Sequence, residues 1–134
     1  MRYMLDTNIC IYLIQNHPPQ ALHQLAAKTQ GSVVISVVTY AELRAGLEMQ
    51  GSQRAQDERA LAALTERIPV LPFTEAAAES YGVLRAAVRD RSRDAMDRLI
   101  AAHAVCSGLT LVTNNEADFQ GYPGLVMENW TLGA

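Results

Sequence analysis

The chain is poor in cysteine, lacks a long apolar run, and has no N-terminal leader pattern, and each shortage excludes a class of protein. Two cysteines, Cys10 and Cys106, cannot build a disulfide framework or a four-cysteine zinc site, so we expect reduced thiols in the core. The longest apolar run, residues 9–14, is far shorter than the roughly 20 residues that cross a membrane. Because Asp6 interrupts the first apolar stretch, a signal peptide is excluded and we expect a cytoplasmic protein.

Lysine is also scarce, and the balance of charge argues against a simple nucleic-acid binder. Lys28 is the only lysine, and 11 basic residues face 14 acids, giving a net charge of −3. The distribution weakens that argument, because five of the bases fall within residues 85–98. If four acids were committed to metal ions, the remaining acids would no longer outnumber the bases.

The length and composition predict one globular domain, residues 1–134, with 49% hydrophobic and 19% charged residues. Short β-branched or apolar runs predict strands, and the longer segments between them, bounded by proline, glycine and capping residues, predict helices. Strands are expected at residues 2–5, 33–35, 70–71, 109–112 and 125–127, and helices near residues 7–14, 18–28, 39–49, 58–67, 74–89 and 95–107. This alternation predicts a three-layer α/β/α fold, in which helices flank a short parallel sheet.

Four acids occupy positions that a purely structural role explains poorly. Asp6 directly follows the first strand, and Asp118 follows the strand at residues 109–112. Glu42 lies early in the helix after the second strand, and Asp97 lies early in the helix at residues 95–107. Ligands of open parallel sheets bind beyond the carboxyl ends of the strands, so these acids are expected to converge at one sheet edge.

Each acid also has an ordinary interpretation when taken alone. Asp6 could cap a helix, Glu42 could complete a capping box with Thr39, and Asp97 and Asp118 could complement helix dipoles. Together they favour a metal site, because Asp6 and Asp97 interrupt apolar patterns and buried carboxylates need partners. Oxygen ligands suit Mg2+ or Mn2+ and not zinc.

These residues lie in ordered motifs that resemble the PIN-domain ribonucleases, and among them the VapC toxins of bacterial type II toxin–antitoxin systems. The resemblance runs from Met4 to Trp130. The motifs are Met4-Leu5-Asp6-Thr7-Asn8, Ser36-x-x-Thr39-x-Ala41-Glu42-Leu43, Asp97-Arg98-Leu99-Ile100-Ala101-Ala102-His103-Ala104, Leu111-Val112-Thr113-Asn114-Asn115 with Asp118-Phe119, and Glu128-Asn129-Trp130.

The resemblance implies that Asp6, Glu42, Asp97 and Asp118 bind Mg2+ or Mn2+, supported by Thr7, Thr113 and Asn115. It implies an endoribonuclease that inhibits translation, with initiator tRNA, cut in its anticodon loop, as a target. It also implies a VapB-type antitoxin as partner, a homodimer, and a larger toxin–antitoxin assembly. Two departures stand out. Asn114-Asn115 occurs where many PIN domains have an acid, and residues 91–96 contain no glycine where relatives tend to have a glycine-containing loop before the third acid, which places Asp94 as a stray acid near the metal.

The roles follow from phosphodiester hydrolysis, in which a metal ion lowers the pKa of bound water and clamps phosphate oxygens. We expect Asp6 and Asp97 to be the principal ligands and Glu42 to bind directly or through water. Asp118 would hold a second metal or orient the water, and Thr113 would position the nucleophile or the phosphate. The competing interpretation is a catalytically silent PIN scaffold that only binds a partner.

The remaining polar residues have structural and functional interpretations side by side. Arg98, next to Asp97, is the strongest candidate for a phosphate contact or for orienting a ligand. The other clustered arginines either form a solvated face paired with Asp90 and Asp94 or contact RNA. His103 lies among alanines, which favours a buried, hydrogen-bonded histidine over a general base, and Trp130 is expected to anchor the last strand.

Overall fold

The computed structural model of the chain describes residues 1–132 and contains a parallel sheet in the order β3-β2-β1-β4-β5. The strands are β1 (Tyr3–Leu5), β2 (Val33–Ser36), β3 (Val70–Leu71), β4 (Thr110–Val112) and β5 (Met127–Glu128). Leu5 in β1 pairs with Ile35 on one side and Val112 on the other. Strand order therefore reverses between β1 and β4, and a parallel sheet binds ligands at that switch point.

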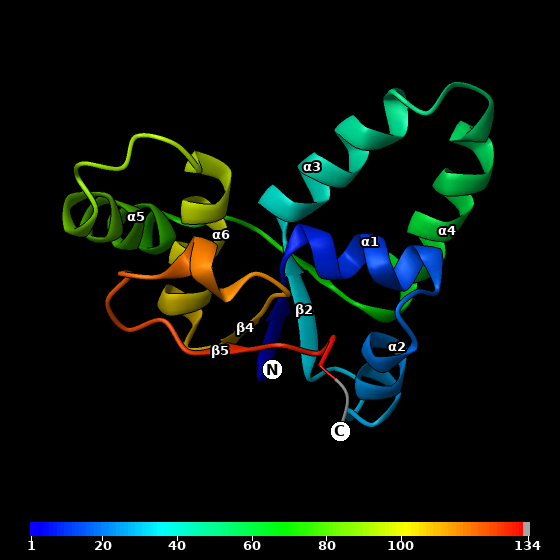
Figure 1. Cartoon of the computed structure of the whole chain (residues 1–134), viewed down its shortest axis with the longest axis horizontal. Coiled ribbons are helices and arrows are strands. Elements are labelled where there is room, and N and C mark those ends of the chain that lie inside the picture. Colours follow the sequence, from blue (N-terminus) through cyan, green and yellow to red (C-terminus); the bar gives the residue numbers. More distant parts are fainter. Residues whose placement is uncertain (133–134) are drawn as a thin grey trace.

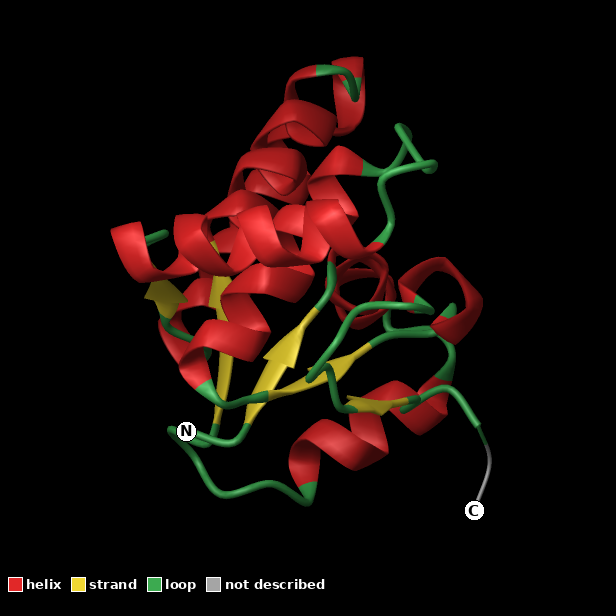
Figure 2. Ribbon diagram, turned by 90° about the vertical axis from the view of Figure 1, so that its left-hand side faces the viewer, coloured by secondary structure: helices red, strands yellow, loops and turns green. Residues whose placement is uncertain are grey.

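Helices cover both faces of the sheet (Figure 1). They are α1 (Thr7–Gln15), α2 (Pro19–Ala26), α3 (Val37–Glu48), α4 (Arg54–Arg67), α5 (Glu75–Ala87) and α6 (Ala95–Ser107), with 3-10 turns η1 (Gly51–Gln53) and η2 (Glu116–Phe119). Figure 2 shows the twist of the strands between these helical layers. The expected three-layer α/β/α architecture is confirmed.

Alternation along the strands divides the core into two halves. Tyr3 and Leu5 of β1 pack in a cluster with side chains from α1 to α4, whereas Met4 packs with α5 and α6. Successive strand residues point to opposite faces, so one three-residue strand contributes to both layers. Trp130 is 1% exposed, stacks edge-on against Tyr3 and closes the first cluster, as the anchoring interpretation predicts.

The start of α3 differs from the sequence prediction. The helix begins at Val37, and the Ser36 hydroxyl caps it by accepting from the backbone N–H of Val38 at 3.0 Å. The capping box expected at Thr39 is therefore wrong, because Thr39 is already a buried residue inside the helix.

Cys10 is fully buried as expected, but Cys106 is only partly buried near the end of α6.

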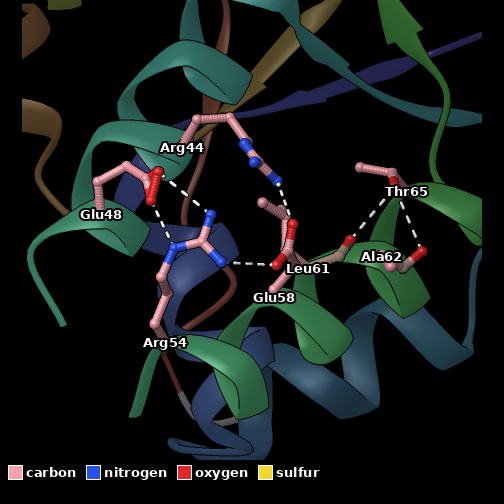
Figure 3. Close-up of polar contacts among 7 residues, drawn as sticks. All are labelled: Arg44, Glu48, Arg54, Glu58, Leu61, Ala62 and Thr65. Carbon is pink, nitrogen blue, oxygen red and sulfur yellow. Dashed lines mark hydrogen bonds and ion pairs between the residues drawn. The ribbon is translucent and has the colours of Figure 1, made fainter. Parts of the chain in front are cut away.

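Ion pairs between side chains connect α3 and α4 at the surface of the protein (Figure 3). Arg54 pairs with Glu48 of α3 and, at 2.8 Å, with Glu58 of α4, and Arg44 of α3 reaches Glu58 at 3.3 Å. These pairs are solvent-exposed, and such pairs contribute about 0–1 kcal/mol each. Their effect is to fix the spacing of the two helices, while Leu43, Leu47 and Leu61 provide the packing.

Within residues 1–132, no helix has both the length and the apolar character that a bilayer crossing requires.

Candidate active site

Asp6 lies at the switch point because it is the single residue between β1 and α1. Its carboxylate caps α1 by accepting from the backbone N–H of Ile9 at 2.9 Å, so the capping interpretation is correct. The side chain is 5% exposed, and burial raises its pKa to about 6, although hydrogen bonds from Thr113 and Ile9 oppose that rise. A cap on a surface helix needs no such burial, so capping alone does not explain Asp6.

Thr113 meets Asp6 from the neighbouring strand. The pairing of Leu5 with Val112 places the residues that follow these two strands side by side, and the Asp6 N–H donates to the Val112 carbonyl at 2.9 Å. The buried Thr113 hydroxyl bonds to the Asp6 carboxylate and accepts from the N–H of Asn115 at 3.0 Å. The hydroxyl hydrogen is thereby directed at Asp6, which fixes the orientation of that carboxylate.

Glu42 comes from the second turn of α3 and is held by Thr7 from the first turn of α1. The Thr7 hydroxyl donates to Glu42 Oε1 at 2.5 Å. The Glu42 charge in turn raises the pKa of Asp6, so the two carboxylates lie within electrostatic reach of each other. The expected supporting position of Thr7 is thus present as a direct contact.

Asp97, in the first turn of α6, links all four acids. Its pKa is raised to about 6, first by burial and then by the negative charges of Glu42, Asp6 and Asp118. Asp94, the residue before α6, adds a smaller repulsion. Acids from four separate elements therefore lie within electrostatic reach of Asp97, and mutual repulsion of this kind is typical of functional sites.

Asp118 is the most exposed of the four. It lies in η2, and its Oδ2 accepts from the side-chain amide of Asn115 at 2.7 Å. Asn115 therefore joins Thr113 to Asp118, through its backbone N–H at one end and its amide at the other. The side chain of Asn114 points elsewhere, donating to the Tyr12 hydroxyl at 2.9 Å.

The donor chemistry at this edge suits a hard divalent cation, since every charged group there is a carboxylate. As placed in residues 1–132, no three acidic, histidine or cysteine side chains lie close enough to hold an ion together. The acids still influence one another through their charges: Glu42 raises the pKa of Asp6, and Glu42, Asp6 and Asp118 raise that of Asp97, although burial is the larger cause for both.

Arg98 does not occupy the position that the sequence suggested. It is 1% exposed, and its guanidinium donates to the carbonyl oxygens of Arg91 at 2.8 Å and Arg93 at 2.6 Å. The expected phosphate contact is wrong, because a buried guanidinium committed to main-chain acceptors cannot reach RNA. Its role is to hold the segment that leads into α6.

His103 is a structural residue, as predicted. It is 2% exposed, and its Nδ1 lies 2.7 Å from the Ser36 hydroxyl, while its ring also bonds to the Pro72 carbonyl. A ring that donates to a carbonyl through Nε2 must accept from Ser36 through Nδ1, which is the neutral form. Burial accordingly lowers the pKa of His103. Through Ser36, this histidine supports the start of the helix that carries Glu42.

The burial of neutral His103 against the Ser36 hydroxyl predicts that the free energy of unfolding depends on pH. His103 takes up a proton more readily in the unfolded chain, so the free energy of unfolding should fall as the pH drops below about 6.5. The raised pKa values of Asp6 and Asp97 act in the opposite direction, because the folded chain then binds the extra protons. The difference between wild type and His103→Gln in urea melts from pH 8 to pH 5 isolates the histidine. Wild type should lose up to about 1.4 kcal/mol per pH unit relative to the variant. Parallel curves would contradict this account of His103.

An apolar groove beside the acids was not foreseen from the sequence. Its apolar lining consists of Ile11, Ile14, Leu43, Gly46, Leu47 and Leu61, and polar side chains also line it: Gln15, Glu42, Gln50 and Asp57. One signal for it was present: residues 9–14 are apolar on more sides of α1 than packing against the sheet requires. The groove itself depends on how α1, α3 and α4 assemble.

Comparison with known proteins identifies the family of the chain. The family model described as PIN domain matches residues 3–125. Ribonuclease VapC2 of Rickettsia felis is 35% identical over 97% of this chain and 98% of its own length. The tRNA(fMet)-specific endonuclease VapC of Shigella flexneri is 38% identical over 98% and 99%. The chain therefore belongs to the PIN domain family, within its VapC ribonucleases, which confirms the resemblance seen in the sequence motifs.

Solved structures give the same answer. VapBC2 from Rickettsia felis, bound to a DNA fragment from its promoter, matches with a TM-score of 0.89 and 34% identity, covering 97% of this chain and 99% of that one. DNA-bound VapBC from Salmonella typhimurium matches with a TM-score of 0.88 and 32% identity over 97% and 98%. Ribonucleases of the PIN family generally depend on a divalent metal ion.

Proposed function

We propose that the chain is the toxin of a type II toxin–antitoxin system, an endoribonuclease that requires Mg2+ or Mn2+. The observation that supports the proposal is that acids from four separate elements lie within electrostatic reach of one another at the switch-point edge of the sheet, where Glu42, Asp6 and Asp118 raise the pKa of Asp97. The names of the relatives supply the substrate class. Initiator tRNA, cut in its anticodon loop, is the proposed target, and loss of this tRNA would stop translation in the cytoplasm.

Asp6 and Asp97 are the proposed principal metal ligands, with Glu42 beside them and Asp118 completing the set. A bound ion would lower the pKa of a water molecule and neutralise charge on the scissile phosphate. Thr113 holds the Asp6 carboxylate in one orientation. The remaining support comes from Thr7 on Glu42 and from Asn115 on Asp118, so each acid except Asp97 is oriented by a neighbour.

The proposed partner is a VapB-type antitoxin seated in the apolar groove between α1, α3 and α4. Structural neighbours of the chain were solved as VapBC complexes, which supports such a partner. The groove reaches Glu42, so a peptide in it would lie against the acid site. Within such complexes we propose a homodimer of this chain as the unit that larger assemblies contain.

Induction of the wild-type chain in bacterial cells, with mapping of RNA 5′ ends, tests the proposed function. We expect growth arrest accompanied by one discrete new end in the anticodon loop of initiator tRNA. Growth arrest without any new RNA end would contradict the nuclease and favour the silent, partner-binding scaffold.

A further inference from the structure

The arginines at residues 85–98 divide into two groups by their contacts. Arg85 donates to the carbonyl oxygens of Val88 at 3.3 Å and Arg89 at 3.1 Å, which closes the end of α5. Arg91 donates to the Gln120 carbonyl at 2.6 Å. These side chains are bound to main-chain acceptors and act as anchors.

Arg98 completes the anchoring from inside the fold. Its buried guanidinium binds the carbonyls of Arg91 and Arg93, and its backbone N–H donates to the Asp94 carbonyl at 2.9 Å. Arg91 also stacks over the Tyr122 ring, 5.0 Å from its centre. The irregular segment before α6 is thus held at the carbonyls of Arg91 and Arg93 by one buried side chain, and at Asp94 by the first backbone hydrogen bond of the helix.

Arg89 and Arg93 behave differently from these anchors. Both side chains are exposed, and within residues 1–132 neither takes part in a salt bridge; the ion pairs there join Arg44 and Arg54 to acids of α3 and α4. The pairing of this cluster with Asp90 and Asp94, one of the two sequence interpretations, is therefore not present. Two cations are left available on a fixed support.

This support lies next to the acid site. Arg98, which directly follows Asp97 in the first turn of α6, donates to the Arg93 carbonyl at 2.6 Å, so the backbone of Arg93 lies beside the turn that carries Asp97. The acids repel phosphate, so an RNA strand that approaches them needs positive charge alongside. Arginine suits that task, because its planar fork matches phosphate geometry.

We propose that Arg89 and Arg93 form a basic rim that binds backbone phosphates of the RNA next to the cleaved bond. The inference rests on the proposed nuclease function and adds the residues that seat the substrate. Phosphate contacts of this kind position the strand and do not read its sequence. The rim therefore contributes to affinity for RNA and leaves the chemical step to the acids.

The test compares Arg89→Gln/Arg93→Gln with Arg59→Gln/Arg67→Gln, which removes the same charge from exposed positions on α4. Binding of labelled initiator tRNA is measured in EDTA by fluorescence anisotropy at several salt concentrations, and cleavage is measured with Mg2+. The rim variant should raise Kd and KM about tenfold and change kcat less than twofold. Its affinity should depend less steeply on salt, by roughly 1 to 1.5 in the logarithmic slope, as for two single-strand phosphates. The control variant should match wild type in every readout.

The outcomes separate the two proposals. If wild type cleaves the tRNA and the rim variant has the same Kd and KM as wild type, the proposed role of the rim is overturned and the nuclease proposal stands. If wild type binds tRNA but does not cleave it, and the rim variant binds it more weakly, the nuclease proposal is overturned and the proposed role of the rim stands. Equal loss of affinity in both double variants would also overturn the rim, since net charge alone would then explain it.

Discussion

Replacing Asp97 by Asn should reduce RNA cleavage by a factor on the order of 1000. The side chain keeps its shape but loses the charge that would hold the metal ion, and metal-ion stabilisation of a phosphoryl transition state amounts to several kcal/mol. Each 1.4 kcal/mol corresponds to about a factor of ten in rate. The measurement is kcat/KM for initiator tRNA in Mg2+, beside Glu66→Gln, which removes one charge from an exposed position on α4.

The same substitution should make the metal-free protein more stable. Burial and four neighbouring carboxylates disfavour the ionised form of Asp97, whose pKa is raised to about 6. The uncharged amide of Asp97→Asn would avoid that repulsion, and we expect the free energy of unfolding at pH 7.5 to rise by about 1 kcal/mol after allowance for solvent screening. An inactive variant that melts later cannot owe its inactivity to misfolding. Near-normal cleavage by Asp97→Asn would contradict its assignment as a ligand.

Replacing Gly46 by Phe should uncouple the chain from its antitoxin. Gly46 lines the apolar groove on α3, and a Cβ built on it meets nothing within 4 Å, so a side chain can be added at this position without a clash at its first atom. A phenyl ring there would occupy the space proposed for the antitoxin. We expect binding to weaken by roughly 100-fold, the loss of about 3 kcal/mol of anchor burial.

Gly82→Phe provides the matched control, because Gly82 lies in α5 and a Cβ there also meets nothing within 4 Å. Tagged chains purified from their own cells should retain the antitoxin in wild type and Gly82→Phe and lose it in Gly46→Phe. Once the antitoxin has been removed, tRNA cleavage should be the same in all three. Equal recovery of antitoxin with both variants would place its binding site elsewhere.

The sequence predicted the layers and the acids better than it predicted their surroundings. Alternating strands and helices are a strong pattern, and Asp6 stands out because an acid directly after a buried strand is unusual. The start of α3 was misjudged because Ser36 and Thr39 are both good capping residues. Only the pairing of Ser36 with His103, 67 residues away in the chain, favours the earlier start.

Arg98 could not be placed correctly from sequence for a related reason. An arginine beside a site acid is normally exposed, and a fully buried one needs several acceptors. Those acceptors are the carbonyls of Arg91 and Arg93, whose directions depend on the irregular path of the segment before α6. The same irregular path that buries Arg98 leaves the side chains of Arg89 and Arg93 exposed to solvent.

The most direct test of the central claim is cleavage of full-length initiator tRNA by the purified chain, measured in Mg2+ and in excess EDTA, with mapping of the new 5′ end. A metal-dependent carboxylate site predicts one discrete cut in Mg2+, its disappearance in EDTA and its return when Mg2+ is restored. The same cut at the same rate in EDTA would contradict the claim that Asp6, Glu42, Asp97 and Asp118 act through a divalent ion.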